Sequence, residues 1–124
     1  MIAAFVATTG LYAYSFEVNG IYYNITDYWE DGEQTEYNCA AVCAGDVQYT
    51  GNVTIPATVT NGGTTYNVRI VEDNAFNGCI RLTSVYIPSS VKKIGSYAFQ
   101  DCRMLTSVTL SNGLKSIDYY AFSG

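Results

Sequence analysis

The chain has no histidine and few basic residues, and each shortage excludes a class of function. Its 124 residues include 6 Lys and Arg against 11 Asp and Glu, which gives a formal net charge of −5. Without histidine the chain lacks the commonest general base, the usual partner of a serine or cysteine nucleophile and the usual catalytic zinc ligand. An acidic chain also gains little from the counterion release that drives nucleic-acid binding. We therefore predict a protein that is not an enzyme, has no cofactor or metal and does not bind nucleic acid.

The charges that are present divide unevenly along the chain. All basic residues follow position 68, so residues 1–68 sum to −7 and residues 69–124 to +2. Only 14% of the residues are charged while 48% are hydrophobic, which is typical of one packed globular domain. The contrast in charge is enough, at most, to orient one end of the molecule toward a partner.

The first fifteen residues carry no charge and are mostly apolar or small. They are fewer than the roughly 20 residues that a membrane-spanning helix needs, so we predict no transmembrane span. Ala13 and Ser15 form a small-x-small cleavage site before Phe16, which indicates a signal peptide over residues 1–15 and a secreted or cell-surface protein. The basic residues that usually open a signal peptide are missing, so packing of this segment on the domain is the alternative.

An internal repeat of 23 residues is the strongest pattern in the sequence. Residues 75–97, AFNGCIRLTSVYIPSSVKKIGSY, align with residues 98–120, AFQDCRMLTSVTLSNGLKSIDYY, and 10 of the 23 positions are identical. A further copy starts in residues 121–124, and a degenerate first copy spans residues 53–74. That first copy carries nine extra residues around Asn61-Gly62-Gly63, which predict a short β-hairpin.

The period and the spacing Leu82-x-x-Val85-x-Ile87 are typical of leucine-rich repeats. Each copy therefore predicts one coil of a solenoid, in which Val85 and Ile87 point into the core while Ser84 and Tyr86 face outward. The remaining core positions are filled by equivalent residues of the two copies: Phe76, Cys79, Val91 and Ile94 in one, and Phe99, Cys102, Leu114 and Ile117 in the other.

The repeat AFxxCxxLTSVxIPxSVxxIGxxAF resembles that of the BspA-like leucine-rich repeat surface proteins, which are found chiefly in anaerobic host-associated bacteria and some protists. The similarity is specific over residues 53–124 and extends more loosely to FEVNGIYYNI, residues 16–25. It implies a short right-handed α/β solenoid that is secreted or surface-attached and acts in adhesion or protein binding without enzymatic activity. Members usually carry many repeats, whereas this chain has barely two and a half.

The four cysteines are predicted to be reduced and buried. Cys79 and Cys102 occupy the same position of neighbouring coils, so their side chains run parallel instead of facing each other. On one strand, Cys39 and Cys43 would stand about 13 Å apart, beyond the roughly 7 Å between Cα atoms that a disulfide spans. Their spacing does not favour the alternative of a four-thiolate zinc site.

Residues 16–50, which precede the repeats, are acidic and rich in aromatic side chains. Strands are predicted on both sides of Asn19-Gly20 and over residues 36–42, with a turn at Asp31-Gly32. A terminal coil needs a cover with a polar outer side. We therefore interpret residues 16–50 as an N-terminal β-hairpin cap and residues 51–124 as the repeats.

Two surfaces are candidates for binding. One lies on the outer sheet face of the repeats and would bind a protein of the host or of a neighbouring cell. Its residues are Thr54, Ser84, Tyr86, Ser107 and Thr109. The other is an aromatic platform of Tyr28 and Trp29, which would make the chain a glycan-binding accessory module of a larger surface protein. The competing interpretations are a solvated sheet face and a cap with its aromatics inside. The acids near the platform do not have the spacing of a calcium loop: Asp27, Glu30, Asp31 and Glu33.

The last coil of the sequence carries apolar side chains that no later repeat covers, namely Leu105, Leu114 and Phe122. Unpaired strand groups at residues 108–110 and exposed apolar side chains recruit other chains. We therefore expect that the native protein either continues with further coils or self-associates through this coil.

Overall fold

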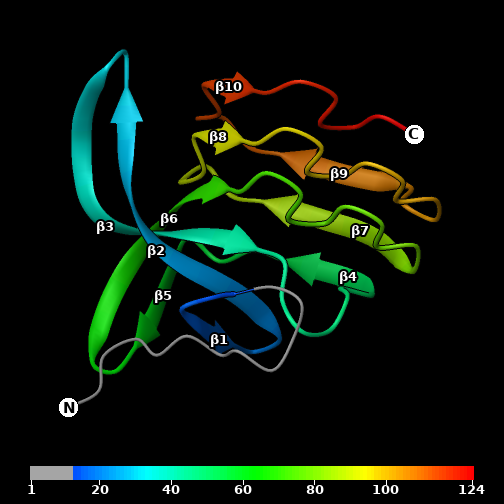
Figure 1. The fold of residues 1–124 in the computed structure, drawn as a ribbon, viewed down its shortest axis with the longest axis horizontal. Coiled ribbons are helices and arrows are strands. Elements are labelled where there is room, and N and C mark those ends of the chain that lie inside the picture. Colours follow the sequence, from blue (N-terminus) through cyan, green and yellow to red (C-terminus); the bar gives the residue numbers. More distant parts are fainter. Residues whose placement is uncertain (1–12) are drawn as a thin grey trace.

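The computed structural model describes residues 13–124, which form two β-sheets around one hydrophobic core (Figure 1). The larger sheet has the strand order β1-β2-β3-β6-β8-β10, with β5 also paired to β6, and the smaller sheet has the order β4-β7-β9. The strands are β1 (Phe16–Val18), β2 (Ile21–Glu30), β3 (Glu33–Cys43), β4 (Gly51–Thr54), β5 (Thr58–Asn61), β6 (Thr64–Val71), β7 (Leu82–Ile87), β8 (Lys93–Ile94), β9 (Ser107–Leu110) and β10 (Ser116–Ile117).

The signal peptide predicted over residues 1–15 lies almost entirely outside the described residues. Of its last residues, Ser15 donates its backbone N–H to the carbonyl of Tyr23 at 2.8 Å. The hydroxyl of Tyr14 donates to the carboxylate of Asp46 at 2.9 Å. Cleavage before Phe16 stays a prediction.

Three hairpins build the cap and the insertion of the first coil, and their turns use residues in the left-handed conformation. Asn19 and Gly20 separate β1 from β2 with φ of 51° and 82°, and Asp31 and Gly32 separate β2 from β3. Gly62 and Gly63 do the same between β5 and β6. A positive φ at both central residues is what a type I′ hairpin turn requires. The hairpins predicted at these three positions are confirmed.

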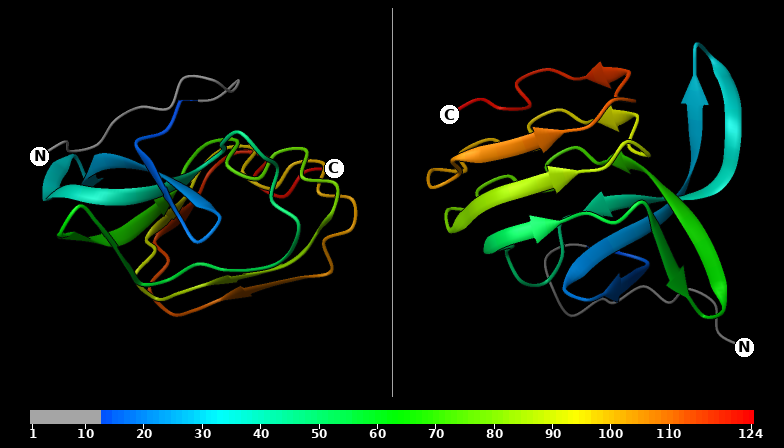
Figure 2. Two further views of the ribbon diagram at one scale, coloured as in Figure 1. Left: turned by 90° about the horizontal axis from the view of Figure 1, so that it is seen from below. Right: turned by 180° about the vertical axis from the view of Figure 1, so that it is seen from behind.

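Successive coils stack through parallel strands, whose partners are 23 residues apart except between β4 and β7, where the insertion of the first coil widens the interval to 32. Val85 of β7 pairs with Val108 of β9, and Ile94 of β8 pairs with Ile117 of β10. Equivalent strands therefore lie side by side in both sheets (Figure 2). The side chain of Val85 is 1% exposed, as predicted for an inward-facing strand position.

The helical part of the predicted α/β solenoid has no counterpart in residues 13–124, where the structure contains strands, turns and bends without a helix. The segment from Ser96 to Asp101 is a series of turns, in which Tyr97 and Asp101 have φ of 59° and 57°. A left-handed residue interrupts a right-handed helix, so two of them within five positions leave no room for an α-helical turn. No helix of the described residues is long and apolar enough to cross a membrane.

The predicted core positions are confirmed for the coil of residues 75–97 and are wrong in part for the coil of residues 98–120. Phe76, Cys79, Val91 and Ile94 are all buried. Their later equivalents Cys102 and Leu114 are only partly buried, and Ile117 is 46% exposed. Within residues 13–124 the strands β9 and β10 have a neighbour on one side only, which explains the difference. Of the side chains expected to face water, Leu105 is also partly buried and Phe122 is exposed, and the self-association stays a prediction.

The cap is continuous with the repeats because β3 pairs in parallel with β6, the first repeat strand of the larger sheet. Val42 pairs with Val71, which pairs with Ile94 in turn. One ladder therefore runs from the hairpin of the cap through the coils.

A column of aromatic rings lies beside these ladders, in which the three phenylalanine rings are stacked and the ring of Tyr49 is tilted by 43° to that of Phe76. The ring centroids of Tyr49 and Phe76 are 4.6 Å apart, those of Phe76 and Phe99 4.9 Å, and those of Phe99 and Phe122 5.0 Å. We call these four residues the aromatic column. At its cap end, the buried hydroxyl of Tyr49 accepts the backbone N–H of Tyr22 at 3.0 Å and donates to the carbonyl of Cys43 at 2.6 Å. The column thus joins the repeats to both long strands of the cap.

The thiols are part of this core. Burial raises the pKa of Cys43 to about 12 and the pKa of Cys39 and Cys102 to about 11. Cys102 is the most accessible of the four and donates its thiol hydrogen to the carbonyl of Phe76 at 3.0 Å. At neutral pH all three thiols are therefore protonated and poorly nucleophilic.

Replacement of Phe99 tests the aromatic column. Phe99 is 2% exposed and stacks on both sides, so Phe99→Ala is expected to lower the free energy of unfolding by about 3–5 kcal/mol. Urea unfolding followed by circular dichroism measures the loss. Phe122→Ala is the matched control, because Phe122 is 45% exposed and has one ring neighbour in the column. Equal losses in the two variants would contradict a column that stabilises through burial.

Thiol alkylation tests the accessibility and the raised pKa values of the cysteines. We expect native protein at pH 8 to react with iodoacetamide far more slowly than denatured protein, with Cys102 modified first. The denatured chain should show four free thiols without added reductant. Cys102→Ala should remove the fastest native phase, and peptide mapping identifies the modified residue. Modification of Cys39 or Cys43 ahead of Cys102, or two or fewer free thiols, would be the opposite result.

Candidate functional site

The outer face of β4, β7 and β9 brings together all five residues predicted for the first surface. Strand register places Thr54 beside Tyr86 and Tyr86 beside Thr109. A second row places Asn52 beside Ser84 and Ser84 beside Ser107. We call these six residues the polar strip: Asn52, Thr54, Ser84, Tyr86, Ser107 and Thr109.

Alternation along each strand directs the strip outward. The residues between its members are the inward-facing Val53, Val85 and Val108, and successive side chains on a strand point to opposite faces. Tyr86 is 42% exposed while Val85 next to it is 1% exposed. Burial of Val85 and partial burial of Val53 and Val108 therefore hold the polar side chains at the surface.

Hydrogen bonds order three side chains of the strip, those of Asn52, Ser84 and Tyr86. The side-chain carbonyl of Asn52 accepts from the hydroxyls of Ser84 at 2.7 Å and Thr83 at 3.0 Å. The hydroxyl of Ser111 donates to that of Tyr86 at 3.2 Å. The result is an uncharged surface of hydroxyl, phenol and amide groups, which supplies donors and acceptors for non-covalent recognition.

The predicted aromatic platform of Tyr28 and Trp29 is wrong, because Tyr28 is buried and only Trp29 is exposed. Tyr28 is 7% exposed and Trp29 is 59% exposed. Tyr28 lies opposite Glu36 on β3, and Glu36 forms an ion pair with Arg69 of β6 at 2.6 Å. Burial, together with the nearby Glu30, raises the pKa of Tyr28. Tyr28 is thus a core residue of the cap, and only Trp29 is available at the surface.

Two of the acids near Trp29 are engaged with the chain itself. The carboxylate of Asp27 accepts the backbone N–H of Asn38 at 2.9 Å, and Glu30 lies 3.4 Å from the ammonium group of Lys115. Burial alone would raise the pKa of Glu36, but hydrogen bonds from Asn67 and Arg69 outweigh it and lower the pKa. In the described part of the chain, no three cysteine or acidic side chains are grouped so that they could hold a metal ion.

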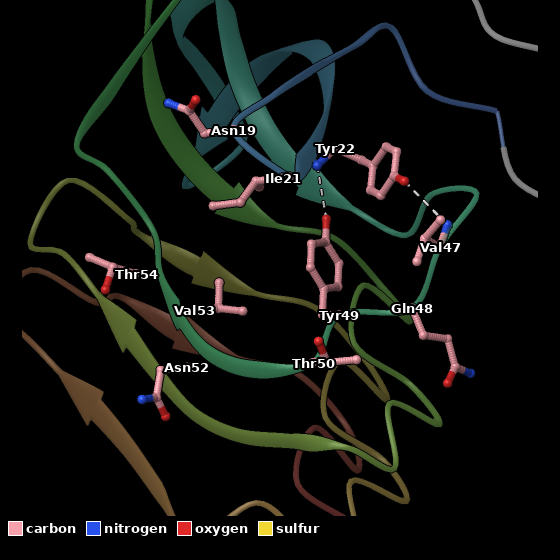
Figure 3. Close-up of a pocket in the computed structure, with 11 residues that line it drawn as sticks. Asn19, Ile21, Tyr22, Val47, Gln48, Tyr49, Thr50, Asn52, Val53 and Thr54 are labelled. Carbon is pink, nitrogen blue, oxygen red and sulfur yellow. Dashed lines mark hydrogen bonds between the residues drawn. The ribbon is translucent and has the colours of Figure 1, made fainter.

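A cleft of about 380 Å³ opens beside the polar strip, between the turn of the cap and β4 (Figure 3). It is lined by residues 19–22, 47–50 and 52–54. Tyr22 holds its walls together, because its backbone N–H binds the hydroxyl of Tyr49 and its own hydroxyl accepts the N–H of Val47 at 3.2 Å.

The sequence analysis missed this cleft and one member of the strip. No short sequence pattern predicts the cleft, because its walls come from separate segments that lie together only in the folded chain. Asn52 could have been predicted as an outward-facing residue, because it alternates with Val53 in the same way that Ser84 alternates with Val85.

Comparison with known proteins shows what this arrangement is similar to. Residues 52–124 match the family model of the BspA type leucine rich repeat region. A sequence search of curated proteins gives no match.

Three crystal structures of bacterial proteins are similar to the chain. A leucine rich cell surface protein of Faecalibacterium prausnitzii has 29% identity and a TM-score of 0.66, over 86% of this chain and 27% of that one. A leucine-rich repeat protein of Bacteroides ovatus has 31% identity and a TM-score of 0.66, over 82% of this chain and 24% of that one. A leucine-rich repeat protein of Bacteroides capillosus has 25% identity and a TM-score of 0.64, over 87% of this chain and 91% of that one.

The chain spans about a quarter of the length of the first two of these proteins. The family model, by contrast, covers more than half of this chain, over residues that include β5 to β10 and all but the first residue of β4. The chain belongs to the BspA-type leucine-rich repeat family.

Proposed function

We propose that the chain is a non-catalytic, secreted or surface-attached module that binds a partner protein through the polar strip. The observation that carries the proposal is the strip itself, an ordered and uncharged row of polar side chains across three parallel strands. An exposed tyrosine at its centre is the type of side chain that dominates the energy of many interfaces.

The chemistry of the chain supports a binding role over a catalytic one. The sequence has no histidine to act as a base for the hydroxyls of the strip. The buried thiols have raised pKa values and are poor nucleophiles.

A surface location is supported by the relatives. The protein of Faecalibacterium prausnitzii is described as a cell surface protein, and it shares 29% identity with this chain. We extend that location to this chain, where adhesion to a host or neighbouring cell would expose the strip to its partner.

Glycan binding is the second candidate function, and the exposure of Trp29 favours it. Its indole is 59% exposed on the hairpin of β2 and β3, which projects beside the coils in Figure 1. With Tyr28 buried, such a site consists of one ring instead of two.

Binding to intact extracellular matrix tests the strip. We expect Tyr86→Ala to reduce retention on immobilised matrix at least tenfold, because it removes the central side chain of the strip and leaves the buried valines in place. Thr65→Ala is the control, since Thr65 is exposed on β6 away from the strip. Unchanged retention of the Tyr86→Ala variant, with Thr65→Ala equal to wild type, would exclude the strip as the binding surface.

The fluorescence of the single tryptophan tests the glycan alternative. Trp29 is the only tryptophan in the chain, so a titration with mucin glycans reports on this residue alone. If glycans stack on it, the emission maximum should shift to shorter wavelength and the shift should saturate. Binding should then be lost in Trp29→Ala and kept in Tyr86→Ala. An unchanged spectrum at saturating glycan would remove Trp29 from consideration.

A further inference from the structure

β4 is the outer strand of the smaller sheet, and one of its edges has no strand partner among residues 13–124. On its other edge, Gly51 and Ile55 donate their backbone N–H groups to carbonyls on the β7 side, at 2.9 and 3.0 Å. Backbone groups of alternate strand residues point to opposite neighbours. Val53 therefore also faces β7, while Asn52 and Thr54 direct their N–H and C=O groups toward the free edge.

These backbone groups have no hydrogen-bond partner in the described part of the chain. Each of the two residues offers one donor and one acceptor. Donors and acceptors that recur at every second residue along a strand are complementary to another extended backbone, which is how peptides add to an exposed sheet edge.

The cleft of about 380 Å³ lies along this free edge and provides room for such a strand. Ile21 of the cap and Val53 of β4 stand on facing sides of it in Figure 3. Val47 adds a third aliphatic side chain, and the rest of the lining is aromatic or polar and uncharged, with no charged residue. The cleft thus combines three aliphatic side chains with neutral hydrogen-bonding groups, and a charged peptide would find no counter-charge in it.

We propose that this cleft binds an extended, uncharged peptide segment of a partner protein, which adds a strand to the free edge of β4. Alternate side chains of the peptide would lie between Ile21 and Val53, so small apolar or β-branched residues fit there. The site uses the backbone of β4, whereas the polar strip uses the side chains of the outer face. The proposal therefore does not depend on the function proposed for the strip.

Hydrogen exchange measured by NMR on the full chain tests the proposal. In the free protein, the amides of Asn52 and Thr54 should exchange rapidly, and those of Val53 and Ile55 slowly. The probes are pools of acetylated, amidated pentapeptides made from Val, Ile, Thr, Ser and Asn, added at millimolar concentration. At least one pool should slow exchange at Asn52 and Thr54 tenfold or more. The same pool with every backbone nitrogen methylated should have no effect.

A pair of variants isolates the backbone donor. Thr54→Pro removes the N–H that faces the cleft and leaves the bonds to β7 intact, as proline permits on an edge strand. It should weaken peptide binding at least tenfold relative to Thr54→Val, which keeps the N–H and accounts for the loss of the threonine hydroxyl. Slow exchange of the Val85 amide shows that a variant is folded. If Thr54→Pro does not fold, the comparison of the unmethylated and methylated peptide pools on the wild-type protein tests the backbone pairing.

Three results would overturn the proposal. One is a free protein in which Asn52 and Thr54 are already protected, since the edge is then covered by the chain itself or by a second copy. Another is the absence of protection with every pool. The third is equal protection by the methylated pool, which would mean that the peptide binds without backbone pairing.

Discussion

The aromatic column is the contact on which the other parts of the structure depend. Phe76, Phe99 and Phe122 stack with ring planes 5° and 4° apart and centroids 4.9 and 5.0 Å apart. That interval matches the spacing of about 4.8 Å between neighbouring strands. The same distance from one coil to the next therefore suits the stacked rings and the hydrogen bonds of both sheets. A coil shifted along the chain would break all three sets of contacts together, so the repeat has to keep its residue types in register.

The same column explains why the cap and the repeats form one core. Tyr49 occupies the ring position before Phe76, and its hydroxyl binds the backbone of both β2 and β3. Phenylalanine at this position would keep the ring contact with Phe76 but would leave the backbone N–H of Tyr22 and the carbonyl of Cys43 without this partner. Burial strongly raises the pKa of Tyr49, so the hydroxyl stays protonated and can donate. The polar tip of one side chain thus ends the column and holds the hairpin of the cap in place.

The repeat made the side-chain directions in the coils predictable from the sequence, whereas the cap has no repeat and its side-chain directions were harder to predict. Val85, Ile87, Ser84 and Tyr86 could be placed inside or outside because an equivalent strand repeats their alternation. Tyr28 has no equivalent, and the irregular pairing between Thr26 and Trp29 disturbs the alternation on which a sequence-based assignment relies. The helical part of the solenoid was wrongly predicted for a related reason, because the left-handed residues that replace a helix by turns are not all of the expected types. Asn and Gly are the expected left-handed residues, whereas Tyr97 adopts this conformation through its place in the coil, stacked at 5.5 Å on Tyr120.

The pairing of the cap with only one sheet is what gives the molecule its two candidate surfaces. β3 completes the ladder of β6, β8 and β10, so the first coil is covered on that side by a strand. On the other side, within residues 13–124, β4 has no strand partner and faces the turn at Asn19 and Gly20 across a cleft. A hairpin that paired with β4 as well would cover both edges of the first coil, but it would remove the cleft. β4 therefore presents polar side chains on its outer face and backbone groups without a partner among residues 13–124 at its edge. Both arise because the cap pairs with the larger sheet and leaves the edge of the smaller sheet open.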